Sequence, residues 1–117
     1  MIDREALRQA CLSQKGVFED FPFGPEAAVY KVANKMFALI PVNTSPASIS
    51  LKCDPTFAEI LRQSYPAITP GYHLNKKHWN SIVVDGTIPD DELLEMIDQS
   101  YRLVFKSLPK RVREELA

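Results

Sequence analysis

The feature that most constrains this chain is a set of short β-rich segments joined by turns too short to hold a helix. AAVYKVANKMFALIPV divides at Asn34-Lys35 into two apolar, β-branched and aromatic runs, which predicts a β-hairpin over residues 27–42. NTSPAS has turn chemistry, and SISLKC alternates apolar and polar residues over 48–53, as a strand with one buried face does. Because parallel strands need long crossovers and antiparallel strands do not, the sequence predicts an antiparallel sheet.

Helices are expected on both sides of these strands. Asp3 can cap a first helix over about residues 3–15, and Gly16 can end it. Asp54-Pro55 is a capping residue followed by a proline suited to the first helical turn, so a second helix should run to about Ser64. The apolar face expected for this second helix consists of Phe57, Ile60 and Leu61.

The remaining segments complete the expected order. VFEDFPFGPEA suits a short edge strand and a turn, and HWNSIVVDG suits a strand that ends in a tight turn. The acids after Pro89 favour the start of the longest helix, and KRVREEL predicts a short basic helix after it. The predicted fold class is therefore α+β, an antiparallel sheet with flanking helices in the order α-β-β-β(-β)-α-β(-β)-α.

Composition and charge limit the classes of function. At 117 residues, 45% of them apolar and 25% charged, the chain suits a single domain over residues 1–117 with a real core. Its formal charge is -1, from 14 basic and 15 acidic residues, so no global field draws it to nucleic acid or to a membrane. Without a signal-like N-terminus or a long apolar run, we expect a cytoplasmic protein with no membrane partner.

The segment best suited to function is GYHLNKKHWN, which holds both histidines, the only tryptophan and a lysine pair in a loop that leads into a strand. Lysines and a protonated histidine can contact phosphates, and aromatic rings can stack on bases. The candidate nucleic-acid-binding residues are Lys52, Tyr72, His73, Asn75, Lys76, Lys77, His78 and Trp79.

Other residues bear on this hypothesis in both directions. Arg62 and the basic tail Lys110-Arg111-Arg113 would widen the patch if they converged on it. In the alternative interpretation the segment is a solvated loop that Leu74 and Trp79 anchor to the core, and the isoelectric point near 6.1 argues against strong duplex binding.

The segments SISLKCDP, YHLNKKHWNSIVVDG and IPDDELLEMIDQSYRLV together resemble the MmcQ/YjbR-like family of small bacterial domains. The resemblance covers nearly the whole chain and is most specific from Lys52 to Val104. It implies a bacterial, cytoplasmic protein with a CyaY-like or secretion-chaperone-like arrangement and a DNA-binding "double wing" fold. It implies no catalytic residues.

Metal and enzyme chemistry have weaker support in the sequence. His73 and His78 are five positions apart without a third ligand at a recognised spacing, so no metal or other cofactor is expected. Cys11 and Cys53 are interpreted as free, buried thiols, although a Cys53-histidine dyad is compatible with the composition.

The leading hypothesis is a non-enzymatic binding module with DNA as its first candidate ligand. The alternative is a protein-interaction or adaptor domain, which predicts an exposed apolar patch. A small-ligand binder or enzyme that uses the His73/His78 loop ranks last. The expected assembly is a monomer or a weak homodimer.

Overall fold

The described chain contains four helices and six strands. The structure is a computed structural model that describes residues 1–71 and 74–116. Its helices are α1 (Arg4–Leu12), α2 (Pro55–Ser64), α3 (Asp90–Ser107) and α4 (Lys110–Leu116). Its strands are β1 (Val17–Asp20), β2 (Ala27–Val32), β3 (Lys35–Pro41), β4 (Ser48–Lys52), β5 (Ile68–Pro70) and β6 (Trp79–Val83).

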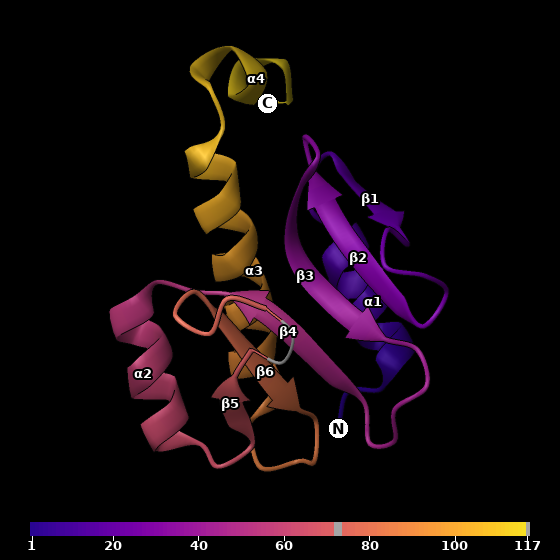
Figure 1. Ribbon diagram of the computed structural model, residues 1–117, viewed down its shortest axis with the longest axis vertical. Coiled ribbons are helices and arrows are strands. Elements are labelled where there is room, and N and C mark those ends of the chain that lie inside the picture. Colours follow the sequence, from indigo (N-terminus) through magenta and orange to yellow (C-terminus); the bar gives the residue numbers. More distant parts are fainter. Residues whose placement is uncertain (72–73, 117) are drawn as a thin grey trace.

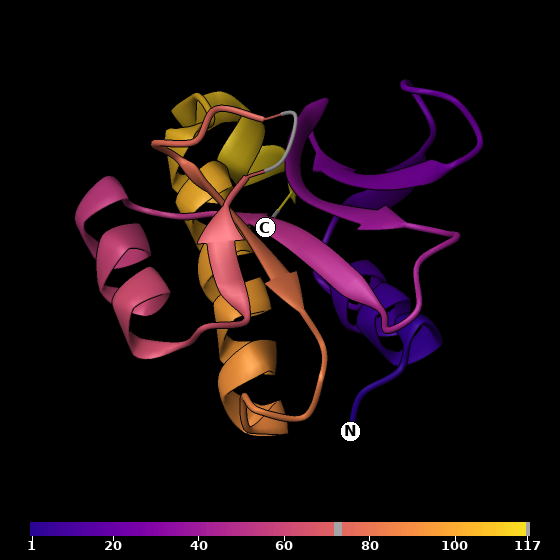
Figure 2. The ribbon, with the colours of Figure 1, turned by 60° about the horizontal axis from the view of Figure 1, so that its bottom comes forward.

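All six strands form one antiparallel sheet in the order β1-β2-β3-β4-β6-β5. Helices α1 and α3 cover one face of this sheet, whereas α2 lies beside β5 and β6 at its far end (Figures 1 and 2). The opposite face, turned towards the viewer in Figure 1, carries no helix from the described part of the chain. The predicted fold class, an antiparallel α+β arrangement, is confirmed.

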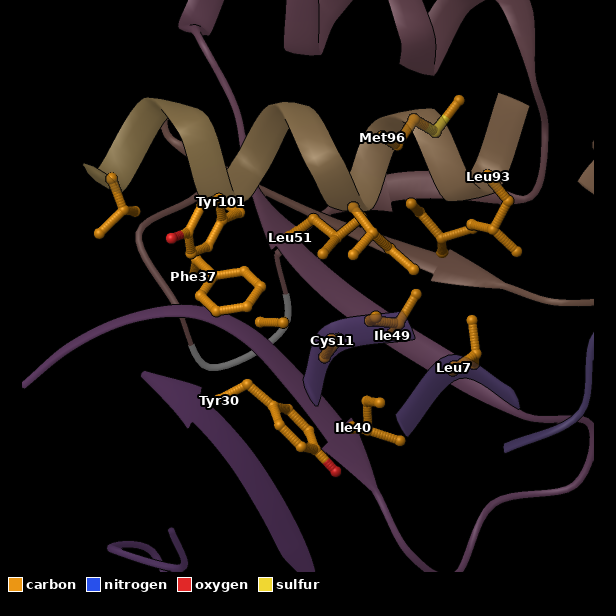
Figure 3. Close-up of a cluster of buried hydrophobic side chains, with 14 of the residues drawn as sticks. Leu7, Cys11, Tyr30, Phe37, Ile40, Ile49, Leu51, Leu93, Met96 and Tyr101 are labelled. Carbon is orange, nitrogen blue, oxygen red and sulfur yellow. The ribbon is translucent and has the colours of Figure 1, made fainter. Parts of the chain in front are cut away.

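The core lies between the sheet and the two helices α1 and α3 (Figure 3). Tyr30, Phe37 and Ile40 of the sheet pack there with Leu7 of α1 and with residues of α3. Phe37 meets Tyr101 of α3 edge to face, with ring centroids 5.5 Å apart. Burying a side chain of this size contributes about 1.5–3 kcal/mol, so this layer holds the sheet against the helices.

Two expected boundaries differ in the structure. The first helix ends at Leu12 rather than near residue 15, because the Ser13 amide bonds back to the carbonyls of Gln9 and Cys11 and closes the last turn. Gly16 lies in the following turn with a φ of 78°. The hairpin turns at Ala33-Asn34, one residue earlier than expected, where both residues have positive φ (48° and 66°). Such a pair matches the twist of the strands that it connects.

The two thiols have different surroundings. Cys11 is fully buried in the core, as expected, and both cysteines are free. Cys53 lies one residue beyond the end of β4 and is only half-buried, so the expectation of a buried thiol in the strand was wrong for this position. None of the described helices is both long and apolar enough to cross a bilayer.

Candidate nucleic-acid interface

The candidate site is built around the turn between β5 and β6, whose described residues 74–78 we call the basic loop. Arg62 of α2 holds this loop in place. Its Nε donates to the side-chain oxygen of Asn80 at 2.7 Å, and its Nη2 donates to the carbonyl oxygens of Trp79, at 3.2 Å, and Lys76. One guanidinium therefore ties the second helix to the loop and to the first residues of β6.

Arg62 is in position because hydrogen bonds fix the start of α2 and join this helix to β6. The Asp54 side chain caps the helix by accepting from the amides of Thr56 and Phe57, at 3.1 and 3.2 Å. Asn80 is only 2% exposed and also donates to the carbonyl oxygen of Ala58 on α2, at 3.4 Å. A buried amide side chain needs such partners, since an unpaired one costs about 1–3 kcal/mol.

Packing at the start of β6 also fixes the loop. Trp79 is 7% exposed, and a Cβ added to Gly71 would lie 2.7 Å from the Trp79 Cβ and 3.3 Å from the Leu74 Cβ. Glycine at residue 71 allows this close approach, because any side chain there would push against Trp79. The anchoring role that the alternative interpretation assigned to Trp79 and Leu74 agrees with this packing, and little of the indole surface is available to a ligand.

The polar candidates of the basic loop lie at its surface. The side-chain oxygen of Asn75 accepts a hydrogen bond from the backbone amide of Lys77 at 2.9 Å, which tightens the turn. Both residues are exposed. Lys76 is exposed too, but its Nζ donates to the Gly71 carbonyl oxygen at 3.1 Å. His78 is half-buried, and its carbonyl oxygen accepts from the Cys53 amide at 2.8 Å.

Lys52 ends β4 next to this loop, because it pairs with Trp79 in the β4–β6 ladder. Tyr72 and His73, which sequence analysis placed in the same site, lie outside the described residues. The structure therefore brings Lys52 beside the basic loop, and five of the eight predicted residues are the consecutive stretch from Asn75 to Trp79.

A polar notch of about 320 Å³ separates the first turn of α2 from the basic loop. Pro55, Thr56, Glu59, Arg62 and Lys77 line it. Neither of the two cations forms an ion pair with an acid of the described chain, and Nη1 of Arg62 donates no hydrogen bond within it. Two positive side chains therefore line one small space, in which Glu59 is the opposing charge. The amides of the adjoining helix end are already capped by the Asp54 carboxylate.

The basic tail does not join this notch. Residues 110–113 belong to α4, which lies at the opposite end of α3 from the β4–β6 region, well away from α2 (Figure 1). Sequence analysis named Arg62 only as a residue that would widen the patch, and it missed Thr56. The sequence signal for these two residues was that both lie on the helix capped by Asp54. It did not identify them as site residues, because nothing in the sequence states that this helix packs beside the loop.

The groups considered for other chemistry are arranged differently. Burial and then the charge of Asp54 raise the pKa of the Cys53 thiol, so this thiol is protonated at neutral pH. A thiol nucleophile needs the opposite shift. Within residues 1–71 and 74–116 there is no cluster of three histidine, cysteine or acidic side chains that could hold a metal ion.

The fold and this surface together define a small α+β domain whose sheet is covered on one face and whose second helix braces a basic loop. The family model YjbR matches residues 12–103, and this chain belongs to the YjbR family. YjbR of Escherichia coli K12 is 33% identical over 110 residues, which are 94% of this chain and 93% of that protein. YbdF of Escherichia coli O157:H7 is 42% identical over 91 residues, which are 78% of this chain and 75% of that protein.

Solved structures show the same fold. A crystal structure of the Deinococcus radiodurans protein DR2400 superposes with a TM-score of 0.93 at 43% identity, over 99% of this chain and 88% of that one. A Pseudomonas syringae crystal structure gives a TM-score of 0.74 at 26% identity, over 87% of this chain and 98% of that one. The names of these proteins state no ligand and no reaction.

Proposed function

We propose that this protein is a non-enzymatic binding module that contacts nucleic-acid phosphates through the notch between α2 and the basic loop. The observation that carries the proposal is the double role of Arg62. Its Nε and Nη2 hold the loop and the start of β6, whereas Nη1 donates no hydrogen bond within the described residues. Arg62 and Lys77 line the same notch. A guanidinium edge and a lysine are the usual protein donors to phosphate oxygens.

The bracing of the loop supports this proposal energetically. Ordering a flexible loop on binding costs about 0.5–1.5 kcal/mol for each side chain that becomes fixed. Here the loop backbone is already held at Lys76 by Arg62 and at His78 by the Cys53 amide, so less of this cost falls on the binding step. Because Glu59 lines the same notch and the net charge is -1, we expect moderate affinity that depends strongly on salt.

A titration of labelled duplex and single-stranded DNA at low and physiological salt tests the proposal. The Lys76→Ala/Lys77→Ala variant should lose binding, whereas the control Lys15→Ala/Lys35→Ala removes the same charge from exposed sites on the β1–β3 half of the sheet and should retain most of it. Since Lys76 also bonds to the Gly71 carbonyl oxygen, tryptophan fluorescence should confirm that the variant keeps its fold. Absence of binding at low salt, or equal losses in both variants, would refute the proposal.

A second candidate function, protein interaction, is favoured by a specific surface. Phe57 and Leu103 are each 38% exposed and line one groove of about 100 Å³ between α2 and α3. Leu61 and Met96, which are buried, also line it. This candidate predicts a salt-tolerant association that a Phe57→Ser/Leu103→Ser variant abolishes, in contrast to the salt-sensitive binding expected at the notch.

A further inference from the structure

The helix-free face of the sheet is hollowed because small side chains occupy its middle. The β4–β6 ladder aligns Ser48 with Val83 and Ser50 with Ser81. Inner strands usually carry β-branched or aromatic residues, which stand higher above the sheet than serine does. On β4, which has neighbours on both sides, the side chains of this face at 48 and 50 are both serine, and the sheet has a depression there.

Three connections turn this depression into a groove of about 660 Å³. Its floor includes Leu39 and Pro41 of β3 as well as the serines. Its walls are Phe23 from the β1–β2 connection, Thr44 from the β3–β4 connection and Leu74 from the β5–β6 connection. Pockets for small molecules in proteins span about 300–1,000 Å³, so this groove has the size of a ligand site.

The chemistry of the lining is mainly apolar. Phe23 is 64% exposed and Val83 is 41% exposed, so large apolar side chains meet water at this groove. Covering such surface contributes about 25 cal/mol for each Å² removed from water. An apolar ligand would therefore be stabilised at this face, which the described helices leave uncovered.

Hydroxyl groups give the groove directional contacts. The Ser50 and Ser81 hydroxyl oxygens lie 2.8 Å apart and share a hydrogen bond across the strands. The hydroxyls of Ser48 and Thr44 bond to no residue of the described chain. Among the described lining residues Glu26 is the only charged side chain, so these residues provide no cation that could pair with a negatively charged ligand.

We propose that this groove binds a compact apolar small molecule that carries a hydrogen-bonding group and no negative charge. The site is distinct from the polar notch, because the two share no lining residue. A peptide strand is a poorer fit, since β4 lies between β3 and β6 and the floor therefore offers no free sheet edge to which a strand could be added.

A titration with the neutral, environment-sensitive dye Nile red tests the site. The wild-type protein should bind the dye saturably with one-to-one stoichiometry, and Ser48→Phe, which fills the hollow, should weaken binding by about tenfold or more. This variant adds apolar surface, so nonspecific adsorption of the dye would instead increase. The control Leu94→Ser removes an exposed apolar side chain from α3, on the other side of the sheet, and should leave binding unchanged.

Phe23→Ser provides an independent variant, because this exposed wall residue lies in a connection and can change without disturbing the sheet. It should also weaken dye binding, and an anionic dye of similar size should bind more weakly than Nile red to the wild type. The proposal is overturned if the wild type shows no saturable binding, if Ser48→Phe and Phe23→Ser both bind as the wild type does, or if Leu94→Ser loses binding equally.

Discussion

Replacing Arg62 with methionine should destabilise the protein by about 2–4 kcal/mol, because the guanidinium donates to three acceptors that link α2 to the start of β6. Methionine keeps an unbranched apolar stem but leaves the oxygen of Asn80 without its donor, and Asn80 is 2% exposed. A buried acceptor left unpaired costs about 1–3 kcal/mol. Losing the bonds to the Lys76 and Trp79 carbonyls raises the cost further, but by less than the sum of the separate losses, because all three bonds come from one side chain.

Urea unfolding followed by the fluorescence of Trp79 measures this cost directly. The matched control is Arg102→Met, since Arg102 also pairs with two groups, Glu95 and Asp98, but its side chain is 52% exposed. Exposed ion pairs contribute about 0–1 kcal/mol, so the control should change the free energy of unfolding little. If Arg62→Met costs no more than Arg102→Met, the bracing of the loop by Arg62 is refuted.

Three further predictions address other parts of the fold. Hydrogen bonding to Arg8 lowers the pKa of the Glu19 carboxyl, so the stability from this group is present above the ordinary glutamate pKa of about 4.3 and is lost as pH falls through the lower folded value. Glu19→Gln should therefore flatten the acid limb of a stability-against-pH curve, and an unchanged limb would contradict this assignment. Ellman's reagent should label Cys53 slowly in the native protein and Cys11 only after unfolding, because Cys11 is 0% exposed and burial raises its pKa to about 12; fast reaction of both thiols would contradict the packing. Gly71→Ala should cost about 1–3 kcal/mol in a thermal or urea melt, because its Cβ would lie 2.7 Å from the tryptophan Cβ, and a neutral effect would show that the loop can yield.

Much of the fold could be predicted because local signals agreed with tertiary packing. The expected α2 matches the observed helix, since Asp54 forms the cap that its position predicted. The hairpin lies where its two apolar, β-branched runs placed it, and the following strand lies where the alternation of SISLKC placed it. The predicted boundaries of elements were less accurate. The end of α1 is an example, because the hydrogen bonds of a single residue, Ser13, determine its last turn.

The candidate site was less predictable, because it depends on contacts between distant segments. Sequence analysis placed Phe57, Ile60 and Leu61 on the apolar face of the second helix. Leu61 is buried, together with Ala58, but Phe57 and Ile60 are 38% and 51% exposed. Helical periodicity identifies an apolar stripe without showing how much of it the sheet covers. Sequence analysis named Arg62 but could not predict that it holds the loop, because its partners are 14 to 18 positions away in sequence.

The open face of the sheet was also beyond sequence inference. Alternation in SISLKC correctly indicated one buried and one polar face, with Ile49 and Leu51 in the core. It could not show that Ser48 and Ser50 lie under three connections that rise above them, because those connections come from three separate parts of the chain.

The most direct test of the central claim is chemical-shift mapping of the ¹⁵N-labelled protein with a short single-stranded DNA at low salt. The account predicts shifts at the first turn of α2 and in residues 74–78, together with the Arg62 side-chain Nε signal, and predicts that they fade as salt is raised. Shifts confined to α4, to the helix-free sheet face or to no residue would contradict a nucleic-acid site at the notch.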